Sequence, residues 1–254
     1  MTTTSRARSF DRAAARYAAG RPSYPASVLD AVEEACGRTL AGLRAVDVGA
    51  GTGIASTLLR GRGADVLAVE PGDGMAAEFR RTLPGVPLVR GDGNALPLAT
   101  GSADLITYAQ SWHWTDTARA VPEALRVLRP GGVLALWWNT GAPNVPWLLE
   151  QDERIADLCG IEPEDRPHPD AVRALRLAGL EGLSADRRLL PWSRSVDIDT
   201  HLDNITSHSV FLVLDDPGRV RAFRDAERAL LAGLFPDGRV EEAYLVDLLT
   251  VVRP

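Results

Sequence analysis

The stretch that decides the fold is RAVDVGAGTGIASTLLR, residues 44–60. Its apolar run at 45–48 predicts a buried strand, and residues 53–60 predict a helix. Between them lies a glycine-rich turn, in which the missing Cβ atoms let the backbone turn tightly and approach a ligand. The helix that follows presents unpaired N–H groups in its first turn. The sequence therefore predicts a strand–turn–helix unit that binds a small ligand.

The spacing of the glycines bears on which ligand this turn binds. A turn of this kind suits either a nicotinamide cofactor or S-adenosylmethionine. The dinucleotide fingerprint G-x-G-x-x-G would place its third glycine at position 54, but that residue is Ile54 and the third glycine is Gly53. The spacing favours S-adenosylmethionine. A nicotinamide-dependent oxidoreductase on a related sheet remains an alternative.

Short apolar runs alternate with helical stretches on both sides of this unit. We expect strands at 45–48, 66–69, 87–89, 105–108, 133–138, 185–197 and 241–252, and helices that include 9–19, 25–35, 53–60, 118–128, 199–207 and 217–234. This alternation predicts an α/β fold: a doubly wound, seven-stranded, Rossmann-like sheet that is parallel except for its last strand. Ligands bind such sheets outside the carboxyl ends of the strands.

One domain over 1–254 accounts for this pattern, because the chain has 254 residues. Within it we expect N-terminal helices over the cofactor at 1–40 and a cofactor-binding core at 41–138. Cap helices and the last strands would occupy 139–254.

Acidic residues stand at the ends of the first three expected strands, in order: Asp47, Glu70 and Asp92. A carboxylate at the position of Glu70 accepts hydrogen bonds from both hydroxyls of a ribose. Asp92, beside small residues, suits an adenine amino group. A solvated loop acid is the alternative for Glu70, and a surface turn is the alternative for Asp92. Three acids at successive strand ends favour one nucleoside site.

With these motifs the sequence resembles class I S-adenosylmethionine-dependent methyltransferases, and within them the small-molecule group of trans-aconitate methyltransferase-like (methyltransferase type 11) and natural-product enzymes. The matching stretches are VDVGAGTG at 46–53, VEP at 69–71, GDGNALPL at 91–98, QSWHW at 110–114 and LRVLRPGG at 125–132, with FDRAAARYAAGRPSYP at 10–25 as the N-terminal signature. The resemblance implies the methyltransferase fold and S-adenosyl-L-methionine as the cofactor.

The resemblance also implies a role for each matching residue. Asp47 would steer the turn, Glu70 would hold the ribose, and Met75 would pack on the adenine ring. Arg21 would pair with the carboxylate of the cofactor, or else form a structural salt bridge. The expected cofactor contacts are Tyr17, Arg21, Asp47, Gly49, Ala50, Gly51, Glu70, Pro71, Met75, Asp92, Gly93, Asn94 and Gln110.

Tryptophans gather after the fourth and fifth strands and predict an apolar acceptor pocket, to which we assign Trp112, Trp114 and Trp138. Adjacent residues of a strand face opposite ways, so one of Trp137 and Trp138 is expected in the core. His113 is the candidate catalytic residue, as a base or as a group that orients the acceptor. A purely structural histidine is the alternative. Enzymes that methylate exocyclic amines of bases or glutamine amides usually carry an Asn/Asp-Pro-Pro-aromatic stretch here, and this sequence lacks it.

The composition argues against several other classes of partner. The net charge is -6 and the 28 basic residues, all arginine, are spread along the chain, so we expect no nucleic acid partner. Cys36 and Cys159 form no C-x-x-C, and His168, His201 and His208 show no ligand spacing, so no metal site is expected. The N-terminus lacks the apolar core of a signal peptide, and no stretch of about 18 apolar residues occurs, which predicts a cytoplasmic protein without a membrane span.

The function expected from these observations is transfer of a methyl group from S-adenosylmethionine to a small-molecule acceptor in biosynthesis. Oxygen is favoured over nitrogen or carbon, because His113 suits an acidic hydroxyl or a carboxylate. A non-methylating protein that uses the same cofactor pocket remains an alternative. A macromolecule methyltransferase would need a basic docking surface or a further recognition domain, and neither is visible. We expect a monomer or a homodimer.

Overall fold

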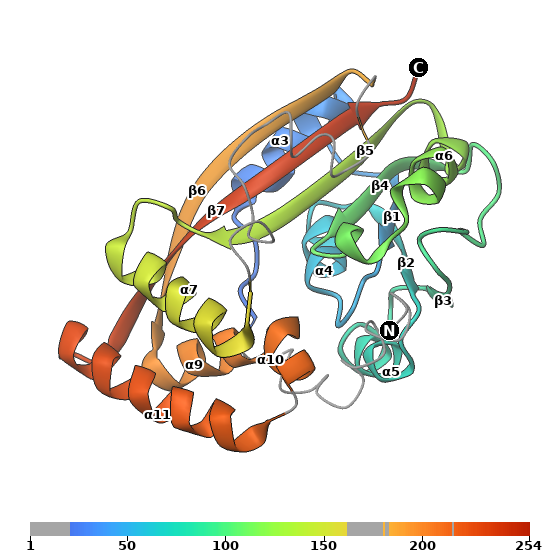
Figure 1. The fold of residues 1–254 in the computed structure, drawn as a ribbon. Helices are drawn as coiled ribbons and strands as arrows, with labels where there is room; N and C mark the ends of the chain where they lie inside the picture. Colours follow the sequence, from blue (N-terminus) through green and yellow to red (C-terminus); the bar gives the residue numbers. More distant parts are fainter. Residues whose placement is uncertain (1–20, 162–179, 181–182, 215) are drawn as a thin grey trace.

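The computed structural model describes residues 21–161, 180, 183–214 and 216–254. They form a seven-stranded sheet with the strand order β3-β2-β1-β4-β5-β7-β6 (Figure 1). The strands are β1 (Arg44–Val48), β2 (Asp65–Glu70), β3 (Leu88–Arg90), β4 (Ala103–Ala109), β5 (Leu128–Gly141), β6 (Ala185–Asp197) and β7 (Arg239–Val252). The helices are α3 (Ala26–Cys36), α4 (Ile54–Gly61), α5 (Asp73–Thr82), the short 3-10 helix η2 (Trp112–Trp114), α6 (Thr117–Val127), α7 (Pro146–Cys159), α9 (Ile198–Thr206), α10 (Ser209–Leu214) and α11 (Pro217–Leu234).

Strands β1 to β5 pair in parallel, whereas β7 runs antiparallel to both β5 and β6. The predicted seven-stranded sheet with an antiparallel last strand is confirmed. The strand order reverses between β1 and β4, which are neighbours in the sheet. In open α/β sheets this reversal is where a crevice forms at the carboxyl ends of the strands.

Each strand divides its side chains between two hydrophobic layers, as its two-residue period requires. In β5, Val133, Ala135 and Trp137 pack with α3, α4 and α5 on one face of the sheet. Leu134 and Leu136 join the cluster that contains α6 on the other face. Helices on both faces bury the central strands and leave their carboxyl ends open for a ligand.

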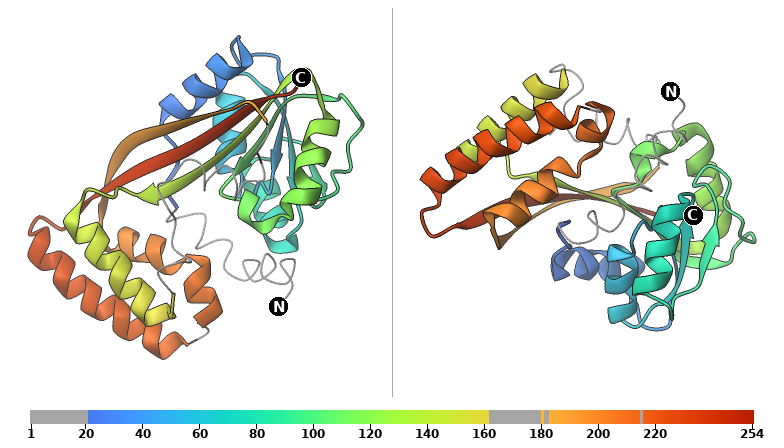
Figure 2. Two further views of the ribbon diagram at one scale, coloured as in Figure 1. Left: turned by 45° about the horizontal axis from the view of Figure 1, so that its top comes forward. Right: turned by 90° about the horizontal axis from the view of Figure 1, so that it is seen from below.

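The three long strands β5, β6 and β7 extend beyond the short ones and carry the cap, formed by α7, α9, α10 and α11, at one end (Figures 1 and 2). The cap has its own apolar cluster of Leu202, Ile205, Leu231 and Val240, against which Trp147 packs. No helix in the described part of the chain is long and apolar enough to cross a bilayer.

Two helices differ between the expected and the described elements. The helix expected at 9–19 lies outside the described residues. Helix α10 was not predicted, because its sequence SVFLVL lacks the polar positions that reveal a helical period. It packs within the cap against α11, where the ring of Phe211 lies 5.4 Å from that of Phe223.

Candidate active site

A pocket opens at the carboxyl ends of β1, β2 and β4, and every predicted cofactor contact in the described part of the chain lines it. These contacts are Arg21, Asp47, Gly49, Ala50, Gly51, Glu70, Pro71, Met75, Asp92, Gly93, Asn94 and Gln110. Tyr17, the remaining predicted contact, lies outside the described residues. Residues that were not predicted also line the pocket, among them Tyr24, Ser111 and Asn139. Asn139 had a signal in the sequence, because it directly follows the strand expected at 133–138, much as the three acids stand at the ends of the first three expected strands.

The glycine-rich turn brings the backbone against its neighbours more closely than any side chain would allow. Gly49 has a φ of +67°, and a Cβ built on it would lie 2.5 Å from Cβ of Ser111. The Gly49 N–H donates to the carbonyl of Val69 at 2.8 Å, and the Ser111 hydroxyl donates to the carbonyl of Val48 at 2.6 Å. The turn is therefore held between β2 and the loop after β4, and only glycine fits at position 49.

Glu70 ends β2 and is 6% exposed, so the alternative of a solvated loop acid is wrong. One carboxylate oxygen accepts the Gly51 N–H at 2.8 Å, and the other accepts the Gly72 N–H at 2.7 Å. Each carboxylate oxygen has a second lone pair. The carboxylate thus fixes the turns after β1 and β2, and Glu70 lines the pocket.

Asp47 connects β1 to two neighbouring elements from a fully buried position. Its carboxylate accepts the hydroxyl of Ser56 in α4 at 2.6 Å and that of Thr107 in β4 at 3.2 Å. Burial raises the pKa of Asp47 to about 6, although these hydrogen bonds oppose the shift. Asp47 thus ties the end of β1 to α4 and β4, and the steering role that the resemblance implies for it stays a prediction.

The loop after β3 is shaped by its own side chains. Asn94 donates through its backbone N–H and its side-chain amide to Asp92 Oδ1, both at 2.8 Å, and its own Oδ1 accepts the Asp116 N–H at 2.7 Å. Tyr108, buried in β4, donates its hydroxyl to the Gly93 carbonyl at 3.2 Å. The amide of Asn94 therefore shapes the loop, while exposed Asp92 presents its carboxylate at the pocket wall.

Gln110 joins the ends of β4 and β5 in a strained conformation. Its φ of +58° lies in the left-handed region, which few residues other than glycine adopt. Its N–H donates to the carbonyl of Trp137 at 2.9 Å, and its side-chain amide donates to the carbonyl of Asn139 at 3.1 Å. Such strain persists where the surrounding structure over-determines it, and it concentrates at functional sites.

The structure separates the tryptophans that the sequence grouped together. Trp114 lines the pocket. Trp112 is 2% exposed and packs edge-to-face on Tyr108 with ring centroids 4.6 Å apart, so its assignment to the acceptor pocket is wrong. Trp137 is the core member of its pair, as the alternation required. Trp138 is half-buried against the α6-side core cluster and is not among the residues that line the cofactor pocket, so its assignment to the acceptor pocket stays a prediction.

His113 lies in η2 beside Trp114, with the two ring centroids 4.6 Å apart. It does not line the cofactor pocket itself, and its accessible surface places it among the exposed residues. Even so, desolvation by the surrounding protein and the positive charge of Arg21 lower the pKa of His113 to about 4. At neutral pH the imidazole is uncharged and can accept a proton.

Comparison with known proteins identifies the family. A family model described as a methyltransferase domain matches residues 46–136. An uncharacterized methyltransferase of Mycobacterium tuberculosis is 44% identical over 225 residues, which are 88% of this chain and 86% of the relative. The chain belongs to the class I S-adenosylmethionine-dependent methyltransferases. A demethylmenaquinone methyltransferase of a Parafrankia strain is 36% identical over 219 residues, 73% of this chain and 85% of that enzyme.

A solved structure shares the fold. A solved putative type II methyltransferase from Anaeromyxobacter dehalogenans has a TM-score of 0.67 and 23% identity, with 91% of this chain and 97% of that chain covered. The enzyme is thus an S-adenosylmethionine-dependent methyltransferase, and the nicotinamide alternative is set aside. The pocket fits that cofactor, because a buried carboxylate, that of Glu70, stands in its lining as an acceptor type for hydroxyls and Gly49 lets the backbone approach the ligand.

Proposed function

We propose that this methyltransferase transfers the methyl group to an oxygen of a small molecule. The observation that carries the proposal is the uncharged His113 beside pocket-lining Trp114, at the carboxyl end of β4. The relative named as a demethylmenaquinone methyltransferase supports a small-molecule acceptor. A cytoplasmic location, a role in biosynthesis and a monomeric or homodimeric state belong to the same proposal.

In this proposal the pocket holds S-adenosylmethionine through residues from three strand ends. Glu70 accepts hydrogen bonds from the ribose hydroxyls, and Asp92 accepts a hydrogen bond from the adenine amino group. Met75 is 5% exposed and packs on the adenine ring, and Arg21 pairs with the carboxylate of the cofactor. When bound, the cofactor supplies an electrophilic methyl group on a sulfonium centre.

The protein contributes positioning and one proton transfer. Displacement at the methyl carbon is in-line, so holding the acceptor oxygen in line with the C–S bond supplies much of the acceleration. The C–O bond forms as the C–S bond breaks, and the electron pair of that bond goes to the sulfur. His113 accepts the hydroxyl proton, which its uncharged state at neutral pH permits. For an acceptor that arrives as a carboxylate, His113 donates a hydrogen bond and only orients it.

The cofactor site is tested by calorimetric titration with S-adenosylmethionine, S-adenosylhomocysteine and NADH. We expect the first two to bind and NADH not to bind. Glu70→Ala should weaken binding by about 1–3 kcal/mol, because ribose hydroxyls lose their partner. Unchanged affinity in that variant would remove Glu70 from the site.

The acceptor side is tested by the transfer of labelled methyl to a panel of phenols, hydroxy acids and amines. We expect O-methylated products, and His113→Gln should lower kcat by about 10²–10⁴-fold toward hydroxyl acceptors. Exclusive formation of N- or C-methylated products would overturn the preference for oxygen. Tight cofactor binding without transfer to any member of the panel would favour the non-methylating alternative.

A further inference from the structure

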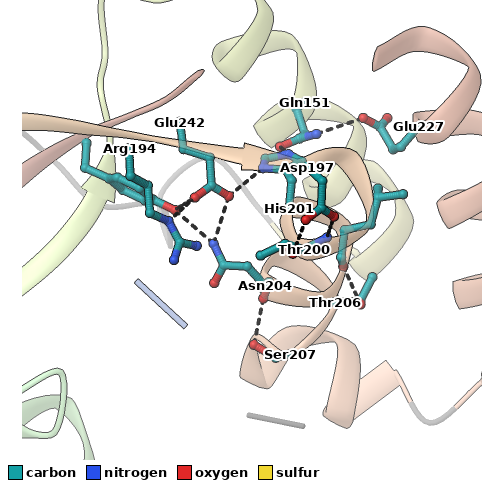
Figure 3. Close-up of polar contacts among 12 residues, drawn as sticks. Gln151, Arg194, Asp197, Thr200, His201, Asn204, Thr206, Ser207, Glu227 and Glu242 are labelled. Atoms are coloured by element: carbon teal, nitrogen blue, oxygen red, sulfur yellow. Dashed lines mark hydrogen bonds and ion pairs between the residues drawn. The ribbon is translucent and has the colours of Figure 1, made fainter. Parts of the chain in front are cut away.

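A buried polar cluster lies on the cap side of the sheet, outside the pocket described above (Figure 3). At its centre, Glu242 of β7 is 1% exposed. Its carboxylate accepts Arg194 Nε at 2.5 Å, His201 Nδ1 at 2.6 Å and the Tyr244 hydroxyl at 2.8 Å. Burial alone would raise the pKa of Glu242, but the hydrogen bonds and charges of His201 and Arg194 lower it to about 2. Glu242 is therefore a fixed anion around which the other side chains are oriented.

Asn204 of α9 is oriented by this anion and is 3% exposed. Its amide nitrogen donates to the Tyr244 hydroxyl oxygen at 2.9 Å and to Glu242 Oε1 at 3.3 Å. Rotating the amide by 180° would turn its oxygen toward the carboxylate of Glu242, so the observed orientation is the favoured one. The amide oxygen Oδ1 is buried and has no hydrogen-bond partner among the described residues. Buried polar atoms are almost always paired, so this oxygen points to a donor that binds there.

One chain of contacts connects Asn204 with the cofactor pocket, and the charge of a pocket residue acts near the end of the helix that carries Asn204. The ring of Tyr244 stacks on Trp192 at 5.0 Å, and Trp192 Nε1 donates to Oδ1 of pocket-lining Asn139 at 2.9 Å. His208 lies just beyond the end of α9, four residues after Asn204, and the charge of pocket-lining Arg21 helps to lower the pKa of His208 to about 3. Asn204 is therefore linked through Tyr244 and Trp192 to a residue that lines the cofactor pocket.

We propose that Asn204 Oδ1 accepts a hydrogen bond from the methyl acceptor. The molecule that receives the methyl group is then aromatic or largely apolar and carries an O–H or N–H group. Its apolar part would match the stacked rings of Trp192 and Tyr244. This assignment rests on the proposed methyl transfer to a small molecule and adds the chemistry by which that molecule is selected. A site with a buried acceptor atom rejects an analogue that lacks the donor, because the protein atom is then left unpaired.

The experiment compares paired probes on the protein saturated with S-adenosylhomocysteine. Phenol is compared with anisole, and aniline with N,N-dimethylaniline, by NMR titration of the side-chain amide resonance of Asn204. We expect the donor-bearing probe of each pair to bind at least about tenfold more tightly and to shift that resonance. In Asn204→Ala the two probes of each pair should bind equally. Equal binding in the native protein, a preference that survives in Asn204→Ala, or no binding by phenol and aniline would each overturn the proposal.

Thr206→Ala is the matched control on the same helix. Thr206 faces α11, where its hydroxyl accepts Arg224 Nη1 at 2.9 Å and donates to the carbonyl of Leu202 at 2.6 Å. This variant should keep the preference for the donor-bearing probes. If Asn204→Ala does not fold, the affinity ratios and resonance shifts of the native protein decide the question. If methyl transfer to oxygen fails, the proposed function fails, but the preference for donor-bearing probes can still be observed. If only that preference is absent, the role of Asn204 fails and the proposed function stands.

Discussion

Replacing Gly49 by alanine should destabilise the enzyme more than the same replacement at Gly51. Both glycines lie in one turn with positive φ, +67° and +56°. A Cβ at Gly49 would lie 2.5 Å from Cβ and 3.0 Å from Oγ of Ser111, whereas nothing lies within 4 Å of a Cβ at Gly51. The two variants therefore share the conformational cost and differ in the steric clash.

The size of the difference follows from these contacts. A left-handed conformation costs an alanine about 1–2 kcal/mol, which is the whole effect expected for Gly51→Ala. Gly49→Ala must also displace Ser111, which costs about 1–3 kcal/mol through overpacking. The displaced hydroxyl loses its 2.6 Å hydrogen bond to the carbonyl of Val48, worth about 1 kcal/mol. Gly49→Ala should therefore be less stable than Gly51→Ala by about 2–4 kcal/mol.

The assay is urea-induced unfolding of each variant without cofactor, so that contacts with the ligand do not enter. The double variant Gly49→Ala/Ser111→Gly removes the clashing Cβ and should recover the overpacking part of the loss. A difference between the single variants below about 0.5 kcal/mol, or no recovery in the double variant, would refute the steric reasoning.

Three further predictions test other parts of the molecule. Trp112→Ala should lower the free energy of unfolding by about 3–5 kcal/mol, because it leaves a cavity in the core. Trp114→Ala should chiefly weaken the affinity for S-adenosylhomocysteine measured by calorimetry. The reverse pattern would return Trp112 to the pocket. Arg154→Met leaves the carboxylate of Glu227, which is 1% exposed, without its cation, and should lower the free energy of unfolding in urea by about 2 kcal/mol. The loss is smaller than for a fully buried pair because Arg154 is 36% exposed. Adding Glu227→Gln should restore most of the lost stability, and an undiminished loss in the double variant would contradict this reasoning. Burial and Arg21 lower the pKa of His208 to about 3 in the folded state, so the free energy of unfolding should fall as the pH falls from about 6.5 toward 4. This loss should be smaller in His208→Gln, and parallel curves of stability against pH for the two proteins would contradict the prediction.

The cofactor half of the site was predictable because its signals are local. Strand ends at Asp47, Glu70 and Asp92 are visible in short apolar runs, and parallel strands bring their carboxyl ends to one edge. The tryptophans were harder to assign, because η2 turns the chain between Trp112 and Trp114. Neighbouring residues of a 3-10 turn point in different directions, and sequence proximity does not say which one faces the core.

The cluster around Glu242 was not predicted, because its members lie on different elements and share no spacing. His201 and Glu242 are 41 residues apart along the chain, on α9 and β7. One signal was present. The two-residue period of β7 places Glu242 on the same side as Val240 and Val246, both fully buried, so an acid stands where an apolar residue is expected. An acid on the inward side of a strand indicates a buried polar network.

The position of β7 also has a consequence for synthesis on the ribosome. This strand follows β5 and β6 along the chain, yet in the sheet it lies between them and pairs Val133 with Val252. Until β7 emerges, β5 presents an unpaired edge that can bind another strand. Pairing of β5 directly with β6 would close the sheet too early and exclude β7. The nascent chain must therefore keep the edges of β5 and β6 apart until β7 has been made. A chaperone that binds exposed strand edges would act at this step.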